Sequence, residues 1–116
     1  MKHNGEFSYD LLLGQRGEGL LADILKLNGD KIEVKTDYKA TRTGNLFIEY
    51  ENRGKASGLA TSRADYWAFI ISNEQIIIVE TNKLKTLCRD NNLSRVNGGD
   101  SNTSKGVLLP LINIIK

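Results

Sequence analysis

Histidine, cysteine and proline each occur only once among the 116 residues. A single cysteine, Cys88, can neither close a disulfide within the chain nor complete a zinc cluster, so we expect it to pack in a reducing compartment. The single histidine, His3, lies near the start of the chain, which disfavours acid–base chemistry by histidine. Ser57 and Ser62 therefore have no histidine partner at hand, and this argues against a serine hydrolase.

Long apolar runs are missing as well. The longest ones, residues 75–79 and 107–115, are far shorter than the ~20 residues that span a bilayer. The first six residues have no apolar region behind their charge, so we expect no secretory signal. No glycine-rich loop of the P-loop type occurs, which disfavours a nucleotide hydrolase. The sequence therefore predicts a soluble, cytoplasmic protein that does not act at a membrane.

The length fits one domain, residues 1–116, because domains most often have about 100–150 residues. The composition, with 40% hydrophobic and 26% charged residues, is typical of a folded protein. The net charge of +2 is only mildly basic, but local clustering of basic residues decides affinity for phosphate. Basic residues do cluster around the acids discussed below, and they are Lys31, Lys35, Lys39, Arg42, Arg53, Lys55 and Arg63.

Hydrophobic periodicity predicts alternating helices and strands. Apolar residues spaced for a helix run from residue 9 to residue 27 and stop at Asn28-Gly29. Alternation predicts strands over residues 30–37 and 46–51, and β-branched residues predict a hairpin of residues 66–71 and 75–80. The remaining predictions are a short helix or turn at 59–64, a helix at 82–90 capped by Thr81, a loop at 91–104, a strand at 107–109 and an apolar tail at 111–115.

Three acidic residues carry the strongest chemical signal. Glu49 and Glu51 stand two apart on a predicted strand, so we expect them to share one face. A hairpin that paired the segment around Asp37 with this strand would bring Asp37 beside Glu49. Three carboxylates at one place repel one another unless a cation offsets them. The sequence therefore predicts a site for a hard divalent cation.

These acids also carry a resemblance. Asp37 followed by Glu49-Tyr50-Glu51 resembles the motif of the PD-(D/E)XK nucleases, a superfamily of restriction enzymes, repair nucleases and Holliday-junction resolvases. Residues 44–49 and 57–67 are similar to segments of small, often phage-borne nucleases of this superfamily. Thr36 stands where the motif has proline, and Glu51 stands where it has lysine, so the resemblance implies that Lys55 or Lys35 supplies the lysine.

The resemblance implies an α/β fold with a restriction-endonuclease-like core, in which helices flank a mixed four- or five-stranded sheet. It implies a DNA endonuclease that uses Mg²⁺, with Mn²⁺ as a substitute, bound by Asp37, Glu49 and the carbonyl of Tyr50. Glu18 would join the site from the first helix, and Glu51 would hold a second ion or act as a base. Junctions or branched DNA are the implied substrate, and a homodimer that buries residues 111–115 or 66–71 is the implied assembly.

Three alternatives remain beside this interpretation. The string Glu33-Val34-Lys35 matches the last part of the motif literally, but Asp30 is too close to Glu33 for a hairpin to join them, so we give it less weight. The chain could also be a nuclease-fold module that lost catalysis with Glu51 and kept binding to nucleic acid or protein. A small interaction protein without a metal is the third interpretation.

Overall fold

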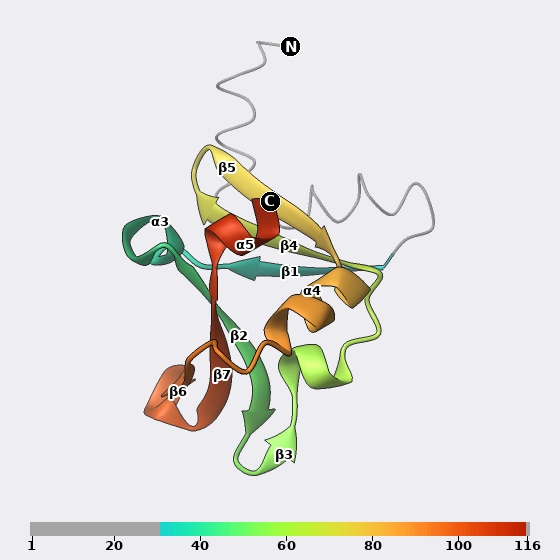
Figure 1. Cartoon of the computed structure of the whole chain (residues 1–116), viewed down its shortest axis with the longest axis vertical. Helices are drawn as coiled ribbons and strands as arrows, with labels where there is room; N and C mark the ends of the chain where they lie inside the picture. The colour runs from blue at the N-terminus through green and yellow to red at the C-terminus, as the bar shows by residue number, and fades with distance from the viewer. Residues whose placement is uncertain (1–30, 116) are drawn as a thin grey trace.

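The computed structural model describes residues 31–115, which form an α/β structure with two sheets and short helices (Figure 1). A mixed three-stranded sheet has the order β1-β4-β5, made of β1 (Ile32–Thr36), β4 (Tyr66–Ser72) and β5 (Gln75–Glu80). An antiparallel four-stranded sheet has the order β3-β2-β7-β6, made of β3 (Lys55–Ala56), β2 (Asn45–Asn52), β7 (Ser104–Pro110) and β6 (Arg95–Gly98).

The helical segments are short. They are α3 (Ala40–Thr43), the 3₁₀ turns η1 (Gly58–Thr61) and η2 (Asp100–Asn102), α4 (Thr81–Cys88) and α5 (Leu111–Ile115). No helix within residues 31–115 is long and apolar enough to cross a membrane. The helix predicted for residues 9–27 lies outside the described residues, and so does Glu18.

Several local predictions are confirmed. β4 and β5 form the expected antiparallel hairpin. The short helix or turn predicted at residues 59–64 is the 3₁₀ turn η1 (Gly58–Thr61). The helix after β5 begins at Thr81 itself, with Glu80 rather than Thr81 at the cap position. The stretch predicted as a loop contains β6, which pairs with β7, and β7 is longer than the predicted strand, reaching Pro110 at its end.

The predicted hairpin between the segment around Asp37 and the strand of Glu49 is wrong. β1 pairs in parallel with β4, whereas β2 pairs antiparallel with β3 and β7, so the two strands belong to different sheets. The chain passes between them through α3, which ends at Gly44 with a left-handed φ of 80°. The expected single sheet of four or five strands is therefore two sheets, and the restriction-endonuclease-like core stays a prediction.

One buried apolar cluster joins both sheets and α4. Trp67 and Phe69 of β4 pack in it with Leu46 of β2 and Leu84 of α4, each with at most 2% of its surface exposed. Residues 67–71 are all buried, with at most 5% of each exposed, so they give no support to a dimer interface at residues 66–71. The cluster fixes the two sheets against each other and thereby places the side chains that β1 and β2 present on their other faces.

We expect Leu46→Ala to lower the free energy of unfolding by about 2–5 kcal/mol, because it leaves a cavity in a fully buried position. Ile78→Ala is the matched control, since 45% of Ile78 is exposed and its truncation should change stability by no more than about 1 kcal/mol. Urea unfolding of both variants measures the difference, and equal effects would contradict the placement of the core.

Candidate functional site

A β-bulge in β2 separates the two glutamates of the predicted motif. Glu49 lies opposite Gly106 of β7, and Glu51 lies opposite the preceding residue, Lys105, with Tyr50 as the extra residue. Because neighbouring residues of β7 face opposite ways, Glu49 and Glu51 also face opposite ways. The prediction that they share a strand face is therefore wrong.

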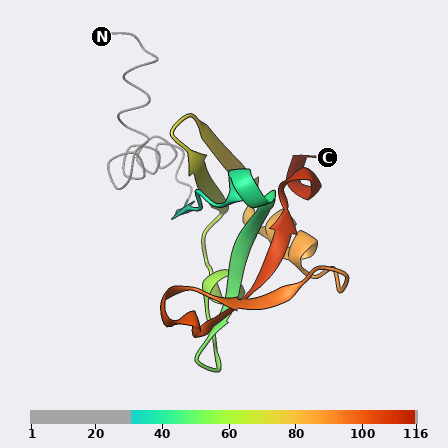
Figure 2. The ribbon, with the colours of Figure 1, turned by 90° about the vertical axis from the view of Figure 1, so that its left-hand side faces the viewer.

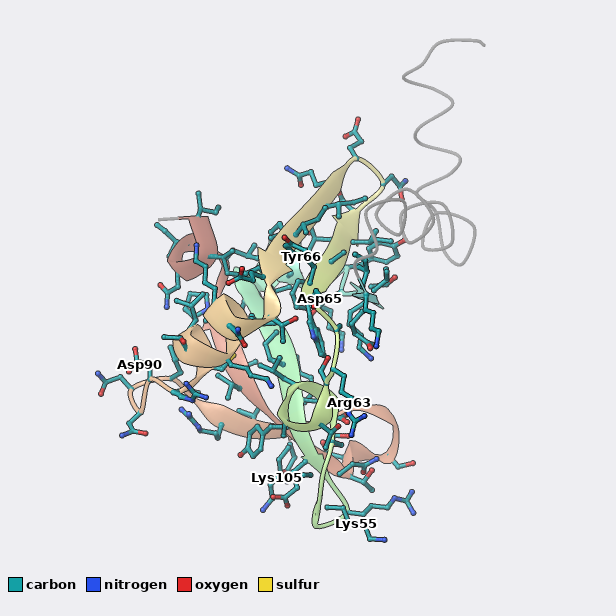
Figure 3. All side chains as sticks on the ribbon, turned by 90° about the vertical axis from the view of Figure 1, so that its right-hand side faces the viewer. Lys55, Arg63, Asp65, Tyr66, Asp90 and Lys105 are labelled. Atoms are coloured by element: carbon teal, nitrogen blue, oxygen red, sulfur yellow. The ribbon has the colours of Figure 1, made fainter. Side chains whose placement is uncertain are left out.

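Glu51 and Lys55 lie apart from Glu49. The carboxylate of Glu51 makes a half-exposed ion pair with the ammonium of Lys105, at 3.6 Å. Lys55 is exposed on β3, at the far tip of the β2–β3 hairpin (Figure 3). Neither residue lines the cavities that Glu49 lines, so the geometry leaves Lys35 as the lysine beside Glu49.

Two adjoining cavities run along the side of the molecule where β1, β2 and β6 meet, and we call them together the β1–β2 groove. One has a volume of about 650 Å³ and the other about 450 Å³. Figure 2 faces this side, with β1 and α3 at one end of β2 and β6 crossing near the other. Both cavities are lined by Lys35, Glu49, Gly58 and Trp67, while Asp37 lines only the larger one and Glu33 only the smaller one.

Asp37 joins the two sheets at the edge of this groove. Its backbone N–H donates to the carbonyl of Ile70 in β4, at 2.9 Å, and continues the pairing of the first sheet. Its carboxylate Oδ2 accepts a hydrogen bond from the backbone N–H of Phe47 in β2, at 3.1 Å. Asp37 therefore connects the two sheets. Its other carboxylate oxygen, Oδ1, has no hydrogen bond within the described residues and is a candidate metal ligand.

Glu49 is held by the segment that follows the β2–β3 hairpin. The hydroxyl of Ser57 donates to Oε2 of Glu49, at 2.8 Å. Gly58 comes so close to β2 that a Cβ there would lie 2.3 Å from the carbonyl oxygen of Glu49. Gly58 also has a φ of +55°, so glycine fits this position on both grounds. The close approach of Gly58 places Ser57 beside β2, and the Ser57 hydrogen bond then orients the Glu49 carboxylate in the groove.

Glu33 and Lys35 of β1 lie beside Glu49, although Glu33 was not among the predicted site residues. The ammonium of Lys35 lies 3.3 Å from the Glu33 carboxylate and 5.8 Å from the centre of the Trp67 ring. Both side chains face the same side of β1, two residues apart, and both line the smaller cavity with Glu49. The signal was present in the string Glu33-Val34-Lys35, which we gave less weight because Asp30 is too close to Glu33 for a hairpin to join them.

The donor chemistry of the groove suits Mg²⁺, which prefers carboxylate and carbonyl oxygens. Asp37 and Glu49 each have one carboxylate oxygen free of hydrogen bonds within the described residues, whereas the carbonyl of Tyr50 accepts the backbone N–H of Ser57 at 3.0 Å. Residues 31–115 bring no group of three or more acidic, histidine or cysteine side chains together in a metal-binding arrangement. A complete site therefore needs water, substrate oxygens or residues outside this range.

Comparison with known proteins adds no family. No family model, curated protein or solved structure matches the chain. The resemblance to PD-(D/E)XK nucleases therefore stays a prediction based on Asp37 and Glu49-Tyr50-Glu51.

A further cavity of about 530 Å³ contains the one cysteine. Cys88, at the end of α4, lines it with Lys85, Arg89 and Arg95. The guanidinium of Arg95 donates to the carbonyls of Cys88, Asp90 and Leu93 and so closes the C-terminal end of α4. Burial raises the pKa of the Cys88 thiol from 9.0 to about 11, against the lowering effect of the Arg95 charge.

We expect Gly58→Ala to destabilise the protein more than Gly54→Ala does. Both glycines have positive φ, which costs alanine about 1–2 kcal/mol, but only at Gly58 does the new methyl group meet backbone atoms of Glu49. The contact should add ~1–3 kcal/mol to the loss at Gly58. Urea unfolding compares the two variants, and an equal loss would show that the close approach to β2 is absent.

The raised pKa of Cys88 predicts a loss of stability at alkaline pH. The unfolded thiol loses its proton near pH 9 and the folded thiol near pH 11, so between these values the folded state holds more protons. Stability from this group is full below pH 9 and falls as the pH rises to 11. Unfolding midpoints of the wild type and Cys88→Ala, measured from pH 8 to 10.5, should converge with rising pH, and a constant difference would refute the assignment.

Proposed function

We propose that the chain is a Mg²⁺-dependent endonuclease that cleaves phosphodiester bonds of DNA and has a restriction-endonuclease-like core. The observation that supports this proposal best is the meeting of Lys35 and Glu33 of β1 with Glu49 of β2 along one groove. A lysine next to carboxylates that face a cavity is a combination suited to phosphodiester cleavage, because it supplies both metal ligands and a cation for the substrate.

Each residue of the groove has a proposed role. Asp37 and Glu49 provide carboxylate oxygens to Mg²⁺, and Ser57 keeps the Glu49 carboxylate in position through its hydrogen bond. Lys35 places its ammonium where it neutralises the scissile phosphate or orients the attacking water. Glu33 holds that ammonium at 3.3 Å. Glu18 remains a further acid implied by the resemblance.

A Mg²⁺ ion in the groove would lower the pKa of a bound water and stabilise the charge that develops on the phosphate in the transition state. The protein residues do the remaining work of binding and orientation. Glu51 has no catalytic role in the proposed reaction, because its side chain pairs with Lys105 on the other face of β2.

Exposed basic residues around the groove support DNA as the partner. Lys39 lies in the wall of the larger cavity and Arg63 in that of the smaller one, and neither has an ion pair within residues 31–115. Phosphates of a DNA backbone would be attracted to both. We propose branched DNA or a junction as the substrate, as the resemblance to Holliday-junction resolvases implies.

We also propose that the enzyme forms a homodimer, because two cuts in a branched substrate need two sites. The side chains that favour this are Ile112 and Ile115 of α5, which are 61% and 74% exposed. Burial of such residues against a second copy would remove apolar surface from water.

The decisive variant is Glu49→Gln, which keeps the shape of the side chain and an acceptor for Ser57 but removes the charge. With Mg²⁺ or Mn²⁺, we expect the wild type to cut labelled four-way-junction or duplex DNA and Glu49→Gln to be at least about 100-fold slower. Glu51→Gln is the matched control on the same strand, and it should retain most activity.

Each other outcome has a definite meaning. Loss of cleavage in Glu51→Gln, with activity kept in Glu49→Gln, would refute the assignment of the groove. Salt-sensitive DNA binding by the wild type without any cleavage would favour the nuclease-fold binding module instead. The absence, among residues 31–115, of three acidic, histidine or cysteine side chains in a metal-binding arrangement is compatible with that module.

A further inference from the structure

Phe47 occupies an unusual position on β2. It lies on the face opposite to the buried Leu46 and Ile48, and it is half-buried although it does not belong to the core cluster. Its side chain projects into the larger cavity of the β1–β2 groove on the same strand face as Glu49. A partly exposed aromatic ring therefore stands two residues from the proposed catalytic carboxylate.

Two glycines make room for this ring. A Cβ on Gly98 of β6 would lie 2.8 Å from the ring of Phe47, and a Cβ on Gly106 of β7 would lie 2.6 Å from it. Any side chain at either position would push the ring away from the sheet. The ring thus packs against the backbone of two neighbouring strands, which leaves its remaining surface toward the cavity and restricts its movement.

The cavity around the ring has an apolar floor and a polar wall. Val96 and Leu108 extend the floor beside Phe47, and Asn45 and Lys39 stand in the wall. The side-chain amide of Asn45 makes no hydrogen bond within residues 31–115, and Lys39 makes no ion pair there. A flat apolar surface, a free amide and a free cation are what a nucleotide needs for its base face, base edge and phosphate.

We propose that this cavity binds one unpaired nucleobase of the DNA substrate, stacked on Phe47, with the adjoining phosphate near Lys39. The base must be unpaired because a base inside a duplex has both faces covered by its neighbours. This inference rests on the proposed function for its partner, DNA. It adds a reason for a preference for branched substrates: a base at a branch point leaves its pair and its stack more easily than one inside a continuous duplex, and a base bound here lies beside Glu49.

The test measures binding without catalysis. Two fluorescein-labelled DNA molecules of equal length, one fully paired and one with a single unpaired nucleotide, are titrated in EDTA and followed by fluorescence anisotropy. We expect the wild type to prefer the DNA with the unpaired nucleotide. Stacking of one base is worth about 1–3 kcal/mol, so Phe47→Leu should reduce this preference by about 5- to 100-fold. Where the wild-type preference is smaller than that, the variant should show no preference.

Two further variants separate stacking from folding. Phe47→Tyr keeps the aromatic ring, so it should keep the preference for the unpaired nucleotide. If substitutions at this position acted through misfolding, Phe47→Tyr would lose the preference as well. Tyr38→Leu removes an aromatic residue that is 48% exposed and does not line the cavity, so it should leave the preference unchanged. An unchanged preference in Phe47→Leu, an equal loss in Tyr38→Leu, or no preference in the wild type would overturn the proposal.

The outcome is independent of cleavage. A preference that depends on Phe47 in a protein that never cuts DNA would support the base site and refute the nuclease. Mg²⁺-dependent cleavage that is lost in Glu49→Gln, without a preference for unpaired bases, would support the nuclease and refute the base site. Absence of DNA binding altogether would refute both.

Discussion

The hydrogen bonds of Asp37 hold the arrangement of this protein together. Its backbone N–H continues the pairing of β1 with β4, and its carboxylate accepts the backbone N–H of Phe47 at the start of β2. One residue thus joins a strand of the first sheet to a strand of the second. The positions of Lys35 and Glu49 relative to each other follow from this junction, because each is fixed on its own strand by sheet pairing.

The bulge at Tyr50 decides which acid faces the groove. Without it, Glu49 and Glu51 would both project from one strand face and repel each other at short distance. With it, Glu49 turns to Ser57 and Lys35, and Glu51 turns to Lys105. Bulges are frequent next to active sites because they redirect single side chains. The bulge therefore supports a functional interpretation of the groove.

The sequence allowed prediction of the elements whose signal is local. The β4–β5 hairpin and α4 follow from periodicity and β-branched residues within a dozen positions. The pairing of β1 was not predictable in this way, because its partner β4 lies about 30 residues away and the nearer β2 gave a plausible alternative. The bulge left no trace in composition or spacing. Lys35 was one of two candidate lysines, but its partner Glu33 was given less weight because Asp30 is too close to Glu33 for a hairpin to join them.

The most direct measurement for the central claim is an NMR titration of the protein with Mn²⁺, which broadens the signals of amides near the ion. The account predicts selective broadening at residues of the β1–β2 groove, above all Lys35, Asp37 and Glu49, and its reversal by excess Mg²⁺. Broadening that centres on Glu51 or on Glu80 of β5, or no broadening at all, would contradict the account.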